Sequence, residues 1–335
     1  MRKILILGVN GFIGSHLVRA LCKNSKNKIY GIDIEKHNII ECLKYKNFFF
    51  YNKDVNHNDN WIEKKIKECE IIIPLIAIAT PNVYVKEPLR VFQLDFESNL
   101  KIVKLVAKYK KRLIFPSTSE VYGISNDANF KEYKTNLVVG PVHKSRWIYS
   151  ASKQLLDRLI FAYGFEKALN FTIFRPFNWI GPRLDSLEKT QLGNGRVLSI
   201  FMNNILNKKK ILLVNGGFQK RSFTYIDDGI SALTKIINSN KNKFNGKIFN
   251  IGNPKNNISI KNLAVVLIEE YNKISKKKYL LKVSSIEEKK FYGKGYEDIK
   301  VRVPSINEAK KYLNWKPKIG FRLAIQKTIK HYILN

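Results

Sequence analysis

The chain has 335 residues, of which 44% are hydrophobic, so it can bury a sizeable core and is not a disordered protein. Its 60 Lys and Arg against 27 Asp and Glu give a formal net charge of +33, a balance typical of proteins that bind nucleic acids or anionic membranes. Only 12 of these residues are Arg, and the Lys are dispersed among Asn, Ile, Phe and Tyr, whose codons are also A/T-rich, so composition drift explains much of the excess.

Short apolar runs alternate with helical patterns over the first 175 residues. The runs predict strands at 3–7, 29–34, 48–52, 71–75, 113–115 and 171–174. Apolar residues at helical spacing predict helices over 13–21, 61–69, 88–110 and 149–164, and again over 259–271 and 323–334 after a glycine-rich stretch. This alternation predicts an α/β fold with a Rossmann-like, doubly wound parallel sheet.

A glycine-rich loop, Gly8-Val9-Asn10-Gly11-Phe12-Ile13-Gly14, follows the first predicted strand and opens the first predicted helix. Glycines allow a tight turn and close approach of the backbone, and a helix N-terminus offers free N–H groups to a pyrophosphate. The candidate cofactor residues are therefore Gly8, Asn10, Gly11, Phe12, Ile13 and Gly14. The spacing is GxxGxxG, and alone it also fits a chance match.

Two acidic positions extend this candidate cofactor site. Asp33, at the end of the second predicted strand, would accept hydrogen bonds from the ribose hydroxyls and repel a 2′-phosphate, which favours NAD over NADP. Asp54 and Val55 follow the third predicted strand and would lie beside the adenine, although a surface-loop aspartate is nearly as good an interpretation.

A second constellation points to alcohol oxidation. Tyr149 and Lys153 form a YxxxK pair, which places phenol and ammonium on one helical face, where the cation stabilises the phenolate as a base. The preceding strand ends in Ser117-Thr118-Ser119-Glu120, whose hydroxyls would hold the substrate alcohol. A lone YxxxK pair is common by chance. The glycine-rich loop, the strand-end hydroxyls and the YxxxK pair rarely occur together in this order by chance.

With these motifs and Arg175-Pro176-Phe177-Asn178, the chain resembles extended short-chain dehydrogenases that act on nucleotide sugars. More closely, it is similar to the dehydrogenase half of the bifunctional, ArnA-type polymyxin-resistance proteins. This closer resemblance covers essentially the whole chain and is carried by residues 76–81, 146–149, 178–185, 219–221 and 292–296.

The resemblance implies an NAD-dependent oxidative decarboxylation of UDP-glucuronic acid to UDP-4-keto-pentose, for the 4-amino-4-deoxy-arabinose added to lipid A. It also implies an NAD-binding domain at 1–175 and a smaller, mainly nucleotide-sugar-binding lobe at 176–335, with the chain free to interleave between them. We expect a homo-oligomer. In the family this half follows a formyltransferase domain, and this chain begins at the first predicted strand, so we expect no formylation from it.

Roles for individual residues follow from the same resemblance. Tyr149 with Lys153 would deprotonate the sugar 4-OH, held by Thr118 and Ser119. Glu120 would be an acid/base partner, and Arg302 a proton donor or relay near C5. Because a free guanidinium has a pKa above 12, transfer through a bound water or charge stabilisation is the easier route for Arg302.

The residues that the resemblance assigns to substrate binding come from both halves of the chain. They are Ala79, Tyr84, Thr118, Ser119, Arg146, Asn178, Arg196, Leu212, Gln219, Lys220, Arg221 and Tyr296. Guanidinium forks such as those of Arg146 and Arg221 suit a carboxylate or diphosphate, although a surface ion pair is as common a role for a single arginine. Leu212 stands where the family usually has lysine, so that contact is lost or passes to Lys210.

Two other functions stay open at this point. A UDP-xylose synthase or a UDP-sugar 4-epimerase on the same fold would return the hydride and release no net NADH. A basic nucleic-acid-binding relic of the fold would have been free to lose Tyr149, Lys153, Glu120 or Arg302, and all four are present. We therefore expect UDP-glucuronic acid rather than nucleic acid as the partner.

Cysteine content and hydropathy bear on the compartment. Cys22, Cys42 and Cys69 form no CxxC pair, which predicts neither a disulfide framework nor a metal site and suits a reducing cytoplasm. The N-terminal apolar run is too short for a signal peptide, and no run reaches the roughly 18 apolar residues of a membrane helix. We expect a cytoplasmic protein without membrane insertion.

Overall fold

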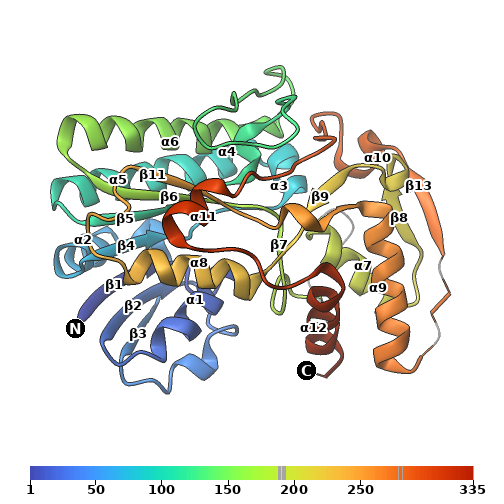
Figure 1. Cartoon of the computed structure of the whole chain (residues 1–335), viewed down its shortest axis with the longest axis horizontal. Coiled ribbons are helices and arrows are strands. Elements are labelled where there is room, and N and C mark those ends of the chain that lie inside the picture. The colour runs from blue at the N-terminus through green and yellow to red at the C-terminus, as the bar shows by residue number, and fades with distance from the viewer. Residues whose placement is uncertain (188–189, 191–193, 278, 281, 335) are drawn as a thin grey trace.

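The computed structural model describes residues 1–187, 190, 194–277, 279–280 and 282–334. A seven-stranded sheet forms the core of its larger part (Figure 1). All its neighbouring strands pair in parallel, in the order β11-β6-β5-β4-β1-β2-β3. Their bounds are β1 (Arg2–Leu7), β2 (Asn27–Asp33), β3 (Phe48–Asn52), β4 (Ile71–Pro74), β5 (Arg112–Pro116), β6 (Asn170–Pro176) and β11 (Lys247–Ile251). The predicted Rossmann-like parallel sheet is confirmed.

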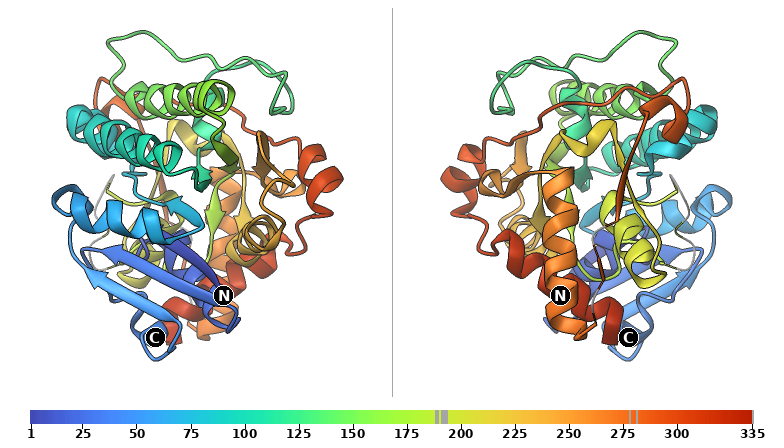
Figure 2. Two further views of the ribbon diagram at one scale, coloured as in Figure 1. Left: turned by 90° about the vertical axis from the view of Figure 1, so that its left-hand side faces the viewer. Right: turned by 90° about the vertical axis from the view of Figure 1, so that its right-hand side faces the viewer.

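Helices cover both faces of this sheet, because alternate residues of its strands face opposite sides (Figure 2). Ile4 and Ile6 belong to the core under α1 (Phe12–Cys22) and α8 (Ile226–Asn238). Leu5 and Leu7 belong to the core under α2 (Asp59–Glu68), α5 (Asn99–Lys108) and α6 (Trp147–Lys167). Because the strands are parallel, their carboxyl ends lie at the same edge of the sheet, between the two helical layers.

The helix predicted over 88–110 contains a wide turn. It runs as α4 (Pro88–Phe92), a π-helical turn η3 (Gln93–Ser98) and then α5. Such π turns rotate the side chains that follow and are frequent at functional sites. Here the turn buries Asp95 completely.

The chain after residue 176 serves both parts of the molecule. It supplies β11 to the large sheet and builds a smaller lobe from strand pairs β10-β7, β12-β9 and β13-β8. The strands of that lobe are β7 (Trp179–Ile180), β8 (Ile211–Val214), β9 (Lys220–Ser222), β10 (Thr224–Tyr225), β12 (Asn257–Ser259) and β13 (Val283–Ile286). Its helices include α7 (Val197–Leu206), α9 (Ile260–Ser275), α10 (Glu288–Tyr292) and α12 (Phe321–Leu334), and α11 (Asn307–Leu313) contacts β11.

Short helical turns complete the described elements. They are α3 (Pro81–Lys86), η1 (Ile40–Cys42), η2 (Val55–His57), η4 (Ser119–Tyr122), η5 (Asn215–Gly217) and η6 (Pro254–Asn256). No helix within the described residues is both long and apolar enough to cross a membrane.

Candidate active site

The loop between β1 and α1 has the shape that a bound dinucleotide requires. Gly8 adopts a φ of +85°, and a Cβ there would lie 2.8 Å from the carbonyl oxygen of Leu75. A Cβ on Gly14 would overlap the carbonyl oxygen of Gly8. Only glycine fits these two positions, and the resulting loop leaves the N-terminus of α1 open to a phosphate.

Asp33 ties the end of β2 to this loop. Its Oδ2 accepts the backbone N–H of Asn10 at 2.8 Å, and its Oδ1 accepts that of Glu35 at 3.3 Å. Burial raises the pKa of Asp33. Gly8, Asn10, Asp33, Asp54 and Val55 all line one cleft of about 1210 Å³, so the structure brings the predicted adenine and ribose contacts together with the glycine loop. These residues fit NAD.

A second cavity, of about 370 Å³, adjoins that cleft and shares Gly8, Gly11 and Phe12 with it. All six residues predicted to be catalytic line this second cavity: Thr118, Ser119, Glu120, Tyr149, Lys153 and Arg302. They come from η4 and the residue before it, from the first turns of α6, and from the segment after residue 298. The structure thus gathers side chains that are far apart in the sequence.

Tyr149 is held as a neutral phenol in this cavity. Its ring stacks on that of Tyr84, with centroids 4.7 Å apart and planes within 8°. Burial raises the pKa of Tyr149, and the Asp95 carboxylate raises it further, whereas the hydroxyl of Thr118 opposes the rise. Its partner in the YxxxK pair, Lys153, has Nζ 6.0 Å from the Tyr149 ring centroid and 3.4 Å from Asp95 Oδ1.

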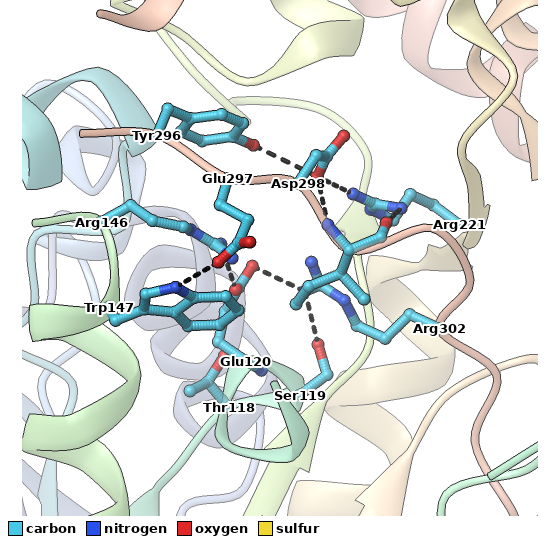
Figure 3. A network of polar contacts seen from close by, with 11 residues as sticks. Thr118, Ser119, Glu120, Arg146, Trp147, Arg221, Tyr296, Glu297, Asp298 and Arg302 are labelled. Carbon is cyan, nitrogen blue, oxygen red and sulfur yellow. Dashed lines mark hydrogen bonds and ion pairs between the residues drawn. The ribbon is translucent and has the colours of Figure 1, made fainter. Parts of the chain in front are cut away.

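Glu120 lies between two guanidiniums. Its Oε1 accepts from Arg302 Nη1 and its Oε2 from Arg146 Nη2, both at 2.6 Å (Figure 3). Burial alone would raise the pKa of Glu120, but Arg302 and Arg146 outweigh it and lower that pKa to about 2. Glu120 is therefore a carboxylate in this arrangement, a weak base whose oxygens accept hydrogen bonds from both guanidiniums.

Arg302 is a buried cation whose charge is opposed by burial and by two neighbouring guanidiniums. Burial lowers its pKa, as do the guanidiniums of Arg221 and Arg146, while Glu120 acts in the other direction. Arg302 Nη1 also donates to the Ser119 hydroxyl at 3.3 Å. The structure thus places a buried guanidinium beside the Ser119 hydroxyl and the Glu120 carboxylate.

Further polar contacts surround the Arg302–Glu120–Arg146 cluster (Figure 3). Arg221 Nη2 pairs with Asp298 Oδ1 at 2.5 Å, and Tyr296 donates to the same oxygen at 3.3 Å. Glu297 accepts from the indole N–H of Trp147 at 2.8 Å, at the start of α6. These contacts therefore join the start of α6 to the segment around 296–298.

The structure divides the predicted substrate residues into three groups. Ten line the catalytic cavity: Ala79, Tyr84, Thr118, Ser119, Asn178, Arg196, Leu212, Gln219, Arg221 and Tyr296. Arg146 is only 1% exposed and lies against Glu120 and Tyr296, outside the lining. Lys220 is exposed on β9 and does not line the cavity. Arg196 lines it while paired with Asp185.

Two acidic residues of the site escaped sequence reasoning. Asp298 lies two residues after Tyr296, just beyond the segment 292–296, so proximity to Tyr296 is the available signal. Asp95 carries no such signal. It is a polar residue within a segment predicted to be one regular helix, and nothing in the sequence marks it as buried. No group of three His, Cys, Asp or Glu suited to a metal occurs in the part of the chain that the structure describes.

The fold and this site together define a dinucleotide-dependent α/β enzyme. Residues 4–252 match the NAD dependent epimerase/dehydratase family, and the chain belongs to that family. The prediction of NAD as cofactor is thereby confirmed.

Solved structures agree with this assignment. The PbgP3 protein of Burkholderia pseudomallei is 44% identical, with a TM-score of 0.88 and coverage of 99% of this chain and 96% of that chain. UDP-glucuronic acid 4-epimerase from Bacillus cereus, solved with UDP-glucuronic acid and NAD, is 23% identical, with a TM-score of 0.82 and coverage of 99% of each chain. The dTDP-glucose 4,6-dehydratase of Bacillus anthracis, solved with NAD, is 23% identical, with a TM-score of 0.80 and coverage of 100% of this chain and 97% of that chain. The last two share the fold.

Proposed function

We propose that this protein oxidatively decarboxylates UDP-glucuronic acid to UDP-4-keto-pentose and CO2, with reduction of NAD to NADH. The observation that carries the proposal is the Arg302–Glu120–Arg146 cluster in the same cavity as Tyr149. An epimerase or dehydrogenase needs only the phenol and the hydroxyls beside it. A buried cation beside a carboxylate in that cavity suits a substrate that carries and loses a carboxylate.

NAD, held by the Gly8–Gly14 loop and by Asp33, supplies the hydride acceptor when bound. In this proposal residues 1–175 and β11 hold the cofactor and the catalytic pair, and the rest of 176–335 mainly holds the nucleotide sugar. The predicted homo-oligomer stays a prediction, and light scattering of the purified protein tests it.

The first chemical event is oxidation at C4, in which the 4-OH loses its proton and C4 loses its hydrogen as hydride. Tyr149, as phenolate, takes the proton of the 4-OH, while Thr118 and Ser119 orient that hydroxyl and the C4 hydrogen leaves as hydride. The phenol has a raised pKa before substrate enters. Its own proton must therefore leave first, and the Lys153 ammonium is the nearby cation that stabilises the resulting phenolate.

The second event is loss of CO2 from the resulting β-keto acid. When the C5–carboxylate bond breaks, its electron pair moves into the C4 carbonyl and gives an enolate. Arg302 stabilises that negative charge, and a proton delivered to C5 by Arg302 or by a water bound to it restores the C–H bond. Glu120 accepts from Arg302 throughout and keeps its guanidinium turned toward the cavity.

The remaining cations suit the nucleotide part of the substrate. Arg221 and Arg196 line the cavity from the smaller lobe, and guanidiniums bind diphosphate oxygens in pairs. The similarity of the whole chain to ArnA-type proteins supports the finer assignment, in which the keto-pentose leads to the 4-amino-4-deoxy-arabinose of lipid A and to polymyxin resistance.

A product assay tests the proposal. The protein is incubated with UDP-glucuronic acid and NAD, and NADH absorbance, released CO2 and the sugar nucleotide are followed together. NADH and CO2 in equal amounts, with a keto-pentose product, support the proposal. CO2 without net NADH indicates a UDP-xylose synthase, and UDP-galacturonic acid without CO2 indicates a 4-epimerase. Either result overturns the oxidative decarboxylase.

A further inference from the structure

Asp95 is a buried acid that the proposed reaction does not use. It lies in the π-helical turn η3, where it is 0% exposed and lines neither cavity. Its Oδ2 accepts the backbone N–H of Ile78 at 2.9 Å. Its Oδ1 has no hydrogen-bond partner among the described residues and faces Lys153 Nζ at 3.4 Å. A buried carboxylate aimed at a catalytic lysine calls for a physical explanation.

Lys153 is equally enclosed, at 1% exposure, and its Nζ makes no hydrogen bond within the described residues. Among the described residues, Asp95 is the one acid within ion-pair distance of the Lys153 ammonium. The other titratable or charged groups around the Lys153–Tyr149 pair are Asp157 from α6, Glu120 from η4, Tyr84 from α3 and Arg196 before α7. Asp157 is engaged by Arg175 at 2.8 Å, and Glu120 by Arg302 and Arg146.

We propose that Asp95 is a positioning residue that holds the Lys153 ammonium back from Tyr149 and thereby sets the pH at which Tyr149 becomes a base. The proposal rests on the proposed role of Tyr149 as that base. The ammonium lies nearer to the carboxylate than to the phenol ring, at 3.4 Å against 6.0 Å from the ring centroid. An ammonium paired with a carboxylate attracts a phenolate less than a free one does.

The titration of the groups agrees with this geometry. Burial raises the pKa of Asp95 to about 6, against the opposing effects of Lys153 and the Ile78 N–H. At neutral pH Asp95 is therefore mostly ionised, and its charge contributes to the raised pKa of Tyr149. Removing that charge lowers the pKa of Tyr149, and the acidic limb of the rate profile moves to lower pH.

The test uses Asp95→Asn, which keeps a carbonyl oxygen for the Ile78 N–H, and Asp95→Thr as a second neutral variant. The first readout is the pH dependence of kcat/KM with UDP-glucuronic acid and NAD. The second is the ionisation midpoint of Tyr149 in the protein without substrate, from NMR of 13Cζ-labelled tyrosine, with its signal assigned by its loss in Tyr149→Phe. Because the second readout needs no turnover, it stands even if the proposed reaction fails.

We expect the acidic limb and the midpoint to move down by roughly one pH unit in the neutral variants. In a Lys153→Met background, Asp95→Asn should shift the midpoint less, because the cation that it positions is gone. Asp228→Asn is the matched control: this buried carboxylate accepts two backbone N–H groups away from both cavities and should leave the midpoint unchanged. The proposal is overturned if the neutral Asp95 variants leave both the acidic limb and the midpoint unshifted. It is also overturned if Asp95→Asn shifts the midpoint equally in the Lys153→Met background.

Discussion

Tyr84 and Tyr149 stack almost face to face, 4.7 Å between ring centroids, with Tyr84 from α3 and Tyr149 from α6. Both rings are buried, and both line the catalytic cavity. The stack fixes the plane of the Tyr149 ring and hence the direction from which its oxygen can meet a sugar hydroxyl. The two phenols therefore share one environment. Their expected roles differ, because Tyr149 is the proposed base and Tyr84 is expected only to bind the substrate.

That difference gives the first prediction. Tyr149→Phe removes the proton acceptor and should lower kcat for oxidation at C4 by at least about 10²-fold, with NAD binding unchanged. Tyr84→Phe keeps the stack and should raise KM while leaving kcat nearly intact. Turnover assays and calorimetry with NAD check both. Retained turnover in Tyr149→Phe would remove this residue from the mechanism.

Arg302 is expected to act after oxidation. Arg302→Met leaves Glu120 with Arg146 alone and removes the charge that stabilises the enolate, so CO2 release should fall by about 10²-fold or more. Binding of UDP should weaken far less. Captured CO2 and UDP titration calorimetry separate the effects, and Arg302→Lys should recover part of the CO2 release. Equal losses in both measurements would make Arg302 a binding residue.

The preference for NAD over NADP is expected to reside in Asp33. Asp33→Asn keeps an acceptor for the Asn10 N–H but removes the charge that repels a 2′-phosphate. The ratio of NADP to NAD dissociation constants, measured by calorimetry, should fall by at least about tenfold, or ~1.4 kcal/mol. Asp54→Asn, beside the expected adenine position, is the control and should leave that ratio as it is. An unchanged ratio in Asp33→Asn contradicts the assignment.

Stability should depend on pH through Glu132. This buried side chain accepts the N–H of Asn250 at 2.8 Å, and burial raises its pKa from 4.5 to about 7. The folded state then holds a proton that the unfolded state loses, so stability falls as pH rises from about 4.5 to 7. Glu132→Gln should remove this loss, a gain of as much as about 3 kcal/mol above pH 7 and little at pH 4.

Denaturant unfolding of the wild type and Glu132→Gln at the two pH values measures this difference. Glu287→Gln, with a side chain 71% exposed, is the control and should show no pH-dependent change. A Glu132→Gln gain that is the same at both pH values would show that the titration of Glu132 is not its source.

Much of the sheet and of the cofactor site could be predicted because each depends on a local pattern. Continuous apolar runs locate β1 and β4, whose faces are both buried, and the glycine loop and YxxxK lie within single segments. By contrast, β11 contains Asn250, a polar residue that breaks the apolar run. Its amide is satisfied inside the core, where Tyr122 donates to it at 2.8 Å and it donates to the Phe130 carbonyl.

Individual contacts between distant segments could not be predicted from local spacing. A regular helix over 88–110 does not predict that Asp95 faces inward. The π turn within this segment rotates the side chains relative to a regular helix, and it thereby buries Asp95. Similarly, an isolated arginine such as Arg146 offers no sign of whether it meets a ligand or, as observed, the carboxylate of Glu120. These features depend on tertiary packing rather than on local spacing.

The late position of β11 in the chain has a consequence for synthesis on the ribosome. β6 emerges with one side unpaired and keeps its N–H and C=O groups exposed until β11 has also left the exit tunnel and pairs with it. During that interval the nascent chain carries an open strand edge beside an apolar core, the kind of surface on which chains mispair and which chaperones cover. Once β11 is in place, it covers the open edge of β6. Glu132 and Tyr133 accept two of the outward N–H groups of β11, so the folded protein offers fewer free N–H groups with which another strand could pair.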